Sequence, residues 1–317
     1  MPLKPERLCP GDTIGIVAPA SPPPDPKAID RAAEKLESLN FKVKLGRHLR
    51  KRCGYLAGYD HERAGDLMRM FEDRTIHAII CLRGGYGTSR ILNLLDFNSI
   101  RTNRKILVGY SDITSLQCAL LRKANLVSFH GPMLNSELVR RDLPAFTLKS
   151  FLSMLCEAKP AGSICANYRG KTVSVLRGGK ARGRLLGGNL SILCAMLATP
   201  WQPMFERRIL FIEDLEEAPY RIDRMLTHLL NAGLLQQVAG IAVGINRNCL
   251  DPKAKSAGEY RQTAEDVLRE RLLPLKVPVV IGLPFGHVPF NATLPVGIEA
   301  ELDGNAGELI ITESAVK

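Results

Sequence analysis

Short apolar runs alternate with amphipathic segments along the first 126 residues, and this alternation is the strongest constraint on the fold of the 317-residue chain. Four apolar runs have the length and pattern of strands, at residues 13–18, 41–45, 76–82 and 105–110. Four segments that separate or follow them repeat apolar residues at helical spacing, at residues 26–40, 60–73, 90–95 and 111–123. Strands that alternate with helices build a parallel sheet with helices on both faces. We therefore expect an α/β fold with a flavodoxin- or Rossmann-like N-terminal domain.

The rest of the chain has a different pattern, which indicates a second domain. A single hydrophobic core rarely grows beyond about 250–300 residues. The alternation weakens after Leu126, and residues 163–182 are polar and basic. We predict an N-terminal domain over 1–157, a linker over 158–182 and a smaller, strand-rich α/β domain over 183–317. The elements expected in the last part are strands at 208–212, 238–245 and 277–283, helices at 187–197 and 220–232, and a hairpin around 303–304.

The chain is strongly basic, with a formal net charge of +11. Part of this charge lies in two clusters, residues 47–52 and 177–184. Such clusters suit nucleic acid, an anionic membrane or an acidic small substrate. No aromatic residue interleaves the first cluster and no nucleic-acid-binding motif is visible, so we expect no nucleic-acid partner. A basic surface or an anionic substrate is the favoured interpretation.

Histidine and cysteine spacing predicts neither a metal site nor a disulfide framework. The six histidines are at least 13 positions apart, and the eight cysteines form no Cys-x-x-Cys pair. Scattered cysteines are typical of a reduced compartment. No apolar run approaches the roughly 20 residues of a membrane span, and the first ten residues have no signal-peptide core. We therefore expect a cytoplasmic protein without metal, cofactor or membrane association.

A serine lies at the bend between a predicted strand and a predicted helix. The apolar run of residues 106–108 ends at Gly109 and Tyr110, and Ser111 and Asp112 then open a segment with helical spacing. A hydroxyl at such a turn is exposed and close to the unpaired N–H groups of a helix, which suits a nucleophile. The alternative is that Ser111 or Asp112 only caps the helix.

Three further polar residues follow predicted strands or short apolar segments. His287 lies in a loop after an apolar strand, where α/β proteins build sites, although a lone histidine there is more often a surface or structural residue. Glu213 ends the run 208–212 and could orient a catalytic base or form an ion pair with Arg221 or Arg224. His130 is a second candidate histidine, for which a buried, hydrogen-bonded structural role is favoured.

A glycine-rich loop follows the third predicted strand at residues 83–87. Its glycines allow backbone N–H groups to approach a ligand closely. The spacing is not Gly-x-Gly-x-x-Gly, so a dinucleotide site is poorly supported. An oxyanion hole is the functional interpretation and a plain tight turn is the alternative.

Taken together, these segments resemble the LD-carboxypeptidase family of serine peptidases, which includes muramoyltetrapeptide carboxypeptidases and microcin C immunity peptidases. The matching segments follow the family's order over nearly the whole chain: residues 11–21, 83–87, 109–114, 129–132, 187–189, 212–214, 219–226 and 286–291. The resemblance implies that Ser111 is the nucleophile, Glu213 the acceptor and His287 the base. It also implies an oxyanion hole made by backbone N–H groups of Gly84 or Gly85 and of Asp112. The candidates for contacting substrate are Arg83, Tyr86, Asn189 and Arg182.

The resemblance implies a substrate as well. Members of the family remove the terminal D-alanine from cell-wall (murein) tetrapeptides, and the implied protein is a cytoplasmic homodimer that acts in peptidoglycan recycling. An immunity peptidase that cleaves a peptide–nucleotide amide is the nearest alternative. Adenine recognition would need an aromatic platform, and the chain has one tryptophan, Trp201, and 6% aromatic residues. A non-catalytic small-ligand binding module, with Ser111 as a helix cap, is the second alternative.

Overall fold

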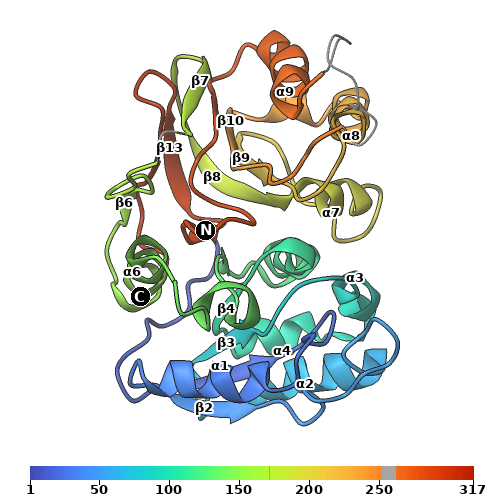
Figure 1. Cartoon of the computed structure of the whole chain (residues 1–317), viewed down its shortest axis with the longest axis vertical. Coiled ribbons are helices and arrows are strands. Elements are labelled where there is room, and N and C mark those ends of the chain that lie inside the picture. Colours follow the sequence, from blue (N-terminus) through green and yellow to red (C-terminus); the bar gives the residue numbers. More distant parts are fainter. Residues whose placement is uncertain (171, 252–261) are drawn as a thin grey trace.

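The chain folds around two β-sheets that lie in opposite halves of the molecule (Figure 1). The computed structural model describes residues 1–170, 172–251 and 262–317. Within these residues the first sheet has six strands, in the order β12-β5-β4-β3-β1-β2. They are β1 (Thr13–Val17), β2 (Lys42–Leu45), β3 (Ala78–Cys81), β4 (Ile106–Gly109), β5 (Ser128–His130) and β12 (Leu294–Val296). β1 to β5 run parallel, whereas β12 pairs antiparallel with β5.

The second sheet is mixed and lies in the upper half of Figure 1. The described residues give it eight strands, in the order β6-β14-β13-β8-β9-β10-β11-β7. Its four central strands run parallel: β8 (Lys180–Asn189), β9 (Arg208–Glu213), β10 (Gly240–Val243) and β11 (Val279–Ile281). The flanking strands pair antiparallel: β6 (Gly162–Ser163), β7 (Ser174–Arg177), β13 (Glu299–Asp303) and β14 (Glu308–Ile311).

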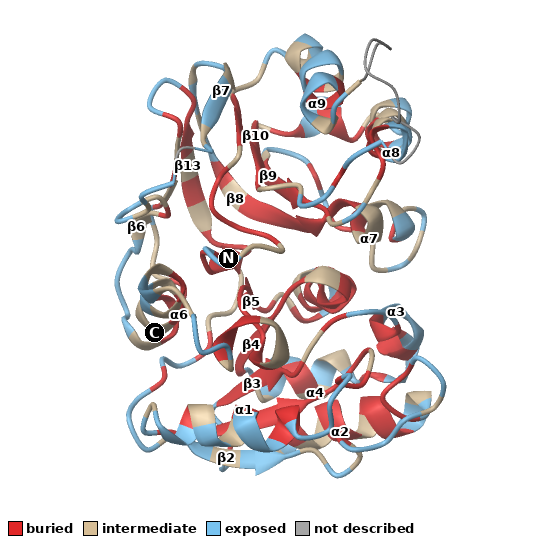
Figure 2. Cartoon of the chain, viewed as in Figure 1, coloured by how far each residue is buried: buried red, intermediate tan, exposed pale blue. Residues whose placement is uncertain are grey.

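Helices connect and cover the strands. The helices in the first half of the chain are α1 (Ala28–Glu37), α2 (Asp60–Glu72), α3 (Thr88–Ile91), α4 (Phe97–Thr102), α5 (Thr114–Ala119) and α6 (Ala145–Cys156). Those of the second half are α7 (Leu190–Ala195), α8 (Pro219–Asn231) and α9 (Ala264–Leu272). Every residue of β3, β4 and β10 is buried, as expected for parallel strands covered on both faces (Figure 2). The predicted α/β fold is therefore confirmed.

Apolar packing continues from one sheet to the other. Successive residues of β9 point to opposite faces, so Leu210 belongs to one hydrophobic cluster and Phe211 to the other. The first cluster also contains Leu107 of β4, and the second contains Val108 of the same strand. Because each cluster includes residues of both sheets, the two halves of the molecule are packed together through shared cores.

The segment 158–182, predicted as a linker, contributes to the second sheet. It contains β6, β7 and the first residues of β8. Its polar composition follows from its position, because β6 and β7 are the two edge strands and their residues are only partly buried or exposed. The sequence pattern also gave no sign of β5, β8, β12, α4 or α9, and residues 187–189, expected to open a helix, are the end of β8 instead. β12 contains Pro295, a residue that sheets accept at an edge, and β12 is an edge strand.

The basic cluster 177–184 pairs with acidic residues of the neighbouring strand. Lys180, Arg182 and Arg184 alternate along β8, and each lies opposite an acidic residue of the antiparallel strand β13. The opposed partners are Asp303, Glu301 and Glu299, and all three pairs form ion pairs. Opposite charges directly across an antiparallel pair stabilise its register.

Among the described residues, no helix is long and apolar enough to cross a membrane.

Candidate active site

Ser111 adopts a backbone conformation that is unusual for a residue with a side chain. It follows β4 and Tyr110, and its φ is +63°. A helix N-cap has extended backbone angles instead, so this geometry does not fit the capping alternative. Left-handed non-glycine residues often occur at functional sites, and a strained strand-to-helix turn is how α/β hydrolases expose a nucleophile.

Glu213 and His287 form a buried pair. Glu213 is the last residue of β9 and has no exposed side-chain surface, while 12% of the His287 side chain is exposed. His287 Nδ1 lies 2.6 Å from Glu213 Oε2. Of the alternative partners suggested for Glu213, Arg221 pairs with Glu217 instead. The structure thus gives Glu213 the geometry of a group that orients an imidazole.

Glycine is required beside this pair. Gly286 has a φ of +109°, and a Cβ at this position would lie 2.9 Å from Glu213 Oε2.

Burial lowers the pKa of His287, but the hydrogen bond and the charge of Glu213 outweigh the effect of burial, so the pKa of His287 lies above its usual value. The imidazolium form of His287 is therefore stabilised by Glu213.

The ring of Tyr110 connects the serine turn to His287. Its centroid lies 4.8 Å from that of the His287 ring, in an edge-on arrangement. The residue before Ser111 therefore packs directly against the imidazole. Three segments that are distant in sequence meet here: the turn after β4, the end of β9 and the loop after β11.

The glycine loop lies against Ser111. A Cβ at Gly84 would lie 3.0 Å from the Cβ of Ser111 and 3.2 Å from its Oγ. Gly85 has a φ of +105° and leaves no room for a side chain beside Ser21. The Asp112 side chain accepts a hydrogen bond from the backbone N–H of Thr88, at 2.8 Å, and so ties the serine turn to the end of this loop. Burial raises the pKa of Asp112, although the bonds from Thr88 oppose the rise.

A network that the sequence analysis did not anticipate supports these loops. Arg63 is almost completely buried, and its guanidinium donates to the carbonyls of Pro19 and Gly87. The Tyr110 hydroxyl donates to the buried carboxyl of Glu137 at 2.5 Å. Burial raises the pKa of Glu137 to about 7. No sequence signal marks these residues, because their partners are backbone groups or side chains from distant segments.

His130 is buried as expected but lacks the expected hydrogen bonds. Its ring packs edge-on against those of Tyr110 and Phe211. Within the residues that the structure describes, neither ring nitrogen has a hydrogen-bond partner, and neither does Glu213 Oε1. Burial lowers the pKa of His130 to about 4, so the ring is neutral at physiological pH.

The four substrate-contact candidates occupy three different environments. Arg83 and Tyr86 belong to the glycine-rich loop that lies against Ser111, and Tyr86 exposes 47% of its surface. Asn189 is buried at the end of β8, where its side chain caps α7 and donates to Asp214 at 2.9 Å. Arg182 lies seven residues earlier on β8 and is paired with Glu301. At about 3.3 Å per strand residue, Arg182 lies roughly 23 Å along β8 from Asn189. The structure does not bring it to the site.

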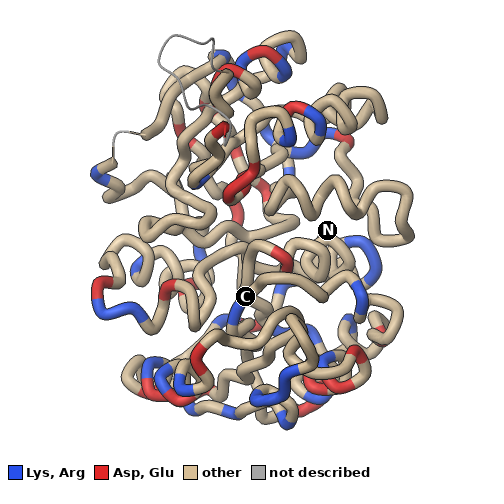
Figure 3. Tube along the Cα trace, turned by 45° about the vertical axis from the view of Figure 1, so that its right-hand side comes forward, with Lys and Arg blue, Asp and Glu red and all other residues tan. Residues whose placement is uncertain are grey.

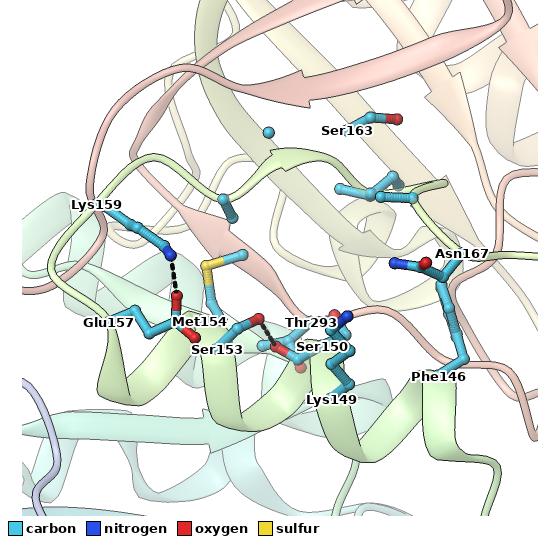
Figure 4. A pocket seen from close by; sticks show the side chains of 14 residues that line it. Phe146, Lys149, Ser150, Ser153, Met154, Glu157, Lys159, Ser163, Asn167 and Thr293 are labelled. Carbon is cyan, nitrogen blue, oxygen red and sulfur yellow. Dashed lines mark hydrogen bonds and ion pairs between the residues drawn. The ribbon is translucent and has the colours of Figure 1, made fainter.

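Two hollows help to locate the site. One of about 190 Å³ is bounded by Tyr110, Glu137, Arg140, Arg247 and His287 among others, so it opens beside the imidazole. Another, of about 320 Å³, lies between α6 and the β6 segment, and an ion pair of Lys159 with Glu157 stands at its edge (Figure 4). None of the predicted site residues lines the second hollow.

Comparison with known families matches both halves of the chain. A model described as the LD-carboxypeptidase N-terminal domain matches residues 14–131, and one described as the LD-carboxypeptidase C-terminal domain matches residues 182–302. The described residues contain no group of three or more His, Cys, Asp or Glu side chains placed to hold a metal ion.

Individual proteins are similar over nearly their whole length. A probable murein peptide carboxypeptidase of Bacillus subtilis is 40% identical over 313 residues, which cover 99% of this chain and 95% of the relative. The crystal structure of muramoyltetrapeptide carboxypeptidase from Oxalobacter formigenes has a TM-score of 0.82 at 34% identity, covering 95% of this chain and 99% of that one.

A third relative has a different name. The microcin C7 self-immunity protein MccF of Escherichia coli is 28% identical over 340 residues, which cover 98% of this chain and 96% of the relative. Its structure in complex with aspartyl sulfamoyl adenosine has a TM-score of 0.88 and covers 100% of both chains. With both domain models matched in order, and with a relative of 40% identity along its length, the chain belongs to the LD-carboxypeptidase family.

Proposed function

We propose that this protein is a serine LD-carboxypeptidase that hydrolyses the terminal D-alanine from murein tetrapeptides during peptidoglycan recycling. The observation that carries the proposal is the His287–Glu213 hydrogen bond, packed against Tyr110, the residue that precedes Ser111. The names of the Bacillus subtilis and Oxalobacter formigenes relatives support the murein peptide as substrate.

In the proposed mechanism, Ser111 Oγ attacks the carbonyl carbon that joins an L-centre to the terminal D-alanine. His287 Nε2 takes the serine proton, while Glu213 holds Nδ1 and stabilises the imidazolium. The negative oxygen of the tetrahedral intermediate accepts hydrogen bonds from the backbone N–H groups of Gly84 or Gly85 and of Asp112. The contact of Gly84 with Ser111 supports this assignment.

The intermediate then breaks down in two stages. His287 returns the proton to the amine of D-alanine as the C–N bond breaks, and the L-residue stays attached to Ser111 as an acyl-enzyme. A water molecule, deprotonated by the same imidazole, attacks the ester and releases the tripeptide. This sequence needs no cofactor. Arg83 and Tyr86, both in the glycine-rich loop, are the proposed substrate contacts.

The proposal is tested by incubating the protein with the free tetrapeptide and following D-alanine by mass spectrometry. The wild type should release D-alanine, and Ser111→Ala should not. Absence of release by the wild type would contradict the proposed reaction and favour a non-catalytic binding module. The family resemblance also leads us to propose that the protein is cytoplasmic and forms a homodimer. Light scattering of the purified protein checks the dimer.

An immunity peptidase acting on a peptide–nucleotide amide is the second candidate. The similarity to MccF supports it, as does one feature of the surface. Tyr55 and Tyr86 are both exposed, and their rings lie 5.7 Å apart beside the glycine loop. Trp201, by contrast, is partly buried against the hydrophobic core. Assaying an aspartyl sulfamoyl adenosine beside the tetrapeptide separates the two candidates, since the favoured one predicts faster turnover of the tetrapeptide.

A further inference from the structure

Arg83, in the glycine-rich loop, and Arg52 have guanidinium groups that pair with no carboxylate of the described residues. Arg83 Nη1 donates to the backbone carbonyl of Pro22 at 3.1 Å, and Arg52 Nη2 donates to that of Pro23 at 3.0 Å. Because the two acceptors are consecutive carbonyls, both guanidinium groups lie on the same short stretch of backbone. In the described part of the chain, neither forms an ion pair with Asp or Glu.

Neighbouring cations differ in this respect. Arg50 pairs with Asp30, and Lys51 Nζ lies 3.4 Å from Glu62. Cationic and acidic residues are interspersed in this way over the outer surface of the first half (Figure 3). The local surface therefore supplies carboxylates to Arg50 and Lys51, but leaves the charges of Arg52 and Arg83 without a counter-charge.

Two neighbouring guanidinium charges without a carboxylate raise the free energy of the substrate-free protein. Burial, and to a smaller extent the charge of Arg52, lower the pKa of Arg83. Two like charges held close together destabilise each other, and a half-buried one also loses hydration. A carboxylate placed between them would remove this cost, because guanidinium groups bind carboxylates through strong, charge-assisted hydrogen bonds.

Arg83 belongs to the loop that lies against the serine. A Cβ at Gly85 would lie 3.7 Å from Nη2 of Arg83, and one at Gly84 would lie 3.2 Å from Oγ of Ser111. Adjacent loop residues thus contact Arg83 and Ser111. Since an extended peptide advances by at most roughly 3.6 Å per residue, a peptide bound along this loop would present a carboxylate to Arg83 within a few residues of the bond under attack.

We propose that Arg52 and Arg83 form a carboxylate-binding subsite that selects acidic peptides as substrates. This inference rests on the proposed function and specifies which chemical group of the substrate is recognised. Two groups of a tetrapeptide fit: the terminal carboxylate of the leaving amino acid, and a carboxylate on the acyl side of the bond.

A purely structural role predicts something different. If the arginines only brace the backbone at Pro22 and Pro23, removing one changes catalysis by the same factor for every peptide. If they bind substrate, the effect depends on a carboxylate being present. Arg52 is the better residue to change, because it is exposed, whereas Arg83 directly supports the glycine loop.

The test measures steady-state hydrolysis by the wild type, Arg52→Met and the matched control Arg50→Met. Three peptides are compared: the unmodified tetrapeptide, one with a terminal carboxamide, and one with carboxamides in place of its internal carboxylates. For the unmodified peptide we expect Arg52→Met to raise KM roughly tenfold with little change in kcat. This rise should vanish with one of the two amidated peptides, which identifies the carboxylate. Arg50→Met should match the wild type.

The same KM for wild type and Arg52→Met, or an equal change for all three peptides, would overturn the subsite. Calorimetry in a Ser111→Ala background separates this result from failure of the proposed function. If the wild type hydrolyses none of the peptides, the proposed function fails. Roughly tenfold weaker binding of the unmodified tetrapeptide on adding Arg52→Met would still support the subsite, and unchanged or undetectable binding would overturn it.

Discussion

His287 Nδ1 lies 2.6 Å from Oε2 of Glu213, a carboxylate with no exposed side-chain surface. A buried carboxylate is costly without a partner, and here the partner is the imidazole of His287, which the carboxylate holds through Nδ1. The pair joins the end of β9 to the loop after β11, so its geometry depends on the packing of the second sheet.

Ser111→Ala should abolish peptide hydrolysis while leaving the fold intact. If Ser111 is the nucleophile, kcat should fall by roughly 10³-fold or more, because no other group forms the acyl-enzyme. Ser89→Ala, a change at an exposed position of α3, is the matched control and should retain wild-type activity. D-alanine release is the measurement, and substantial turnover by Ser111→Ala would contradict the assignment.

The pH dependence should report the His287–Glu213 pair. The base must be neutral, and the pKa of His287 lies above its usual value, so kcat/KM should fall as pH decreases through that raised pKa. In Glu213→Gln the charge is lost, and the acidic limb should move to lower pH. Its kcat should drop by roughly 10²–10⁴-fold. An unshifted limb in Glu213→Gln would show that another group controls it.

Gly84→Ala should impair catalysis more than it impairs folding. The added methyl would lie 3.0 Å from the Ser111 Cβ, and either the loop or the serine must move. A displacement of about 1 Å at the reacting group costs roughly 100-fold in rate. Gly65→Ala on α2 is the comparison, since its closest neighbour is the flexible end of Arg69. Thermal melts and kcat for both variants check the expectation, which fails if Gly84→Ala keeps full activity.

Glu137 should make the folded protein less stable as the pH rises. Its pKa is raised from 4.5 to about 7 by burial, so the folded state binds more protons than the unfolded state between these values. Stability from this group is present below pH 4.5 and is lost as pH rises to about 7, amounting to about 3 kcal/mol. Glu137→Gln should remove that slope. Denaturant unfolding of both proteins across this range is the measurement, and parallel curves would rule the effect out.

Arg182→Ala should leave catalysis unchanged. Arg182 is paired with Glu301 far along β8 from Asn189, so its loss should affect only the β8–β13 pairing. An exposed ion pair contributes about 0–1 kcal/mol, and the variant should therefore lose no more than this. KM for the tetrapeptide and the free energy of unfolding are the two readouts. A raised KM would place Arg182 in the substrate site after all.

The alternation of apolar runs and helices was enough to predict the strands β1 to β4 of the first sheet. Strands such as β3 and β4 are buried on both faces and read as continuous apolar runs. β6, β7 and β12 could not be recognised in this way. The first two are edge strands with partly exposed residues, and β12 is three residues long and contains Pro295. Their strand conformation is imposed by partners that are distant in sequence.

The candidate site likewise contains some residues that the sequence could reveal and others that it could not. Ser111, Glu213 and His287 each follow an apolar strand and lie in recognisable family motifs, so the sequence was informative about them. Arg63 and Glu137 interact with carbonyls, a hydroxyl and a backbone N–H that only the folded chain assembles. Arg182 was proposed as a substrate contact from its charge, but its charge is matched by Glu301 across the sheet.

The strand β12 has a consequence for how the molecule is completed. The loop with His287 starts after β11 in one sheet and ends at β12 in the other. During synthesis, the first sheet cannot gain β12 until residues 294–296 have been made, long after its other described strands. Pairing of that strand with β5 fixes one end of the histidine loop, so the strand that closes the first sheet also anchors the imidazole that Glu213 holds from the second.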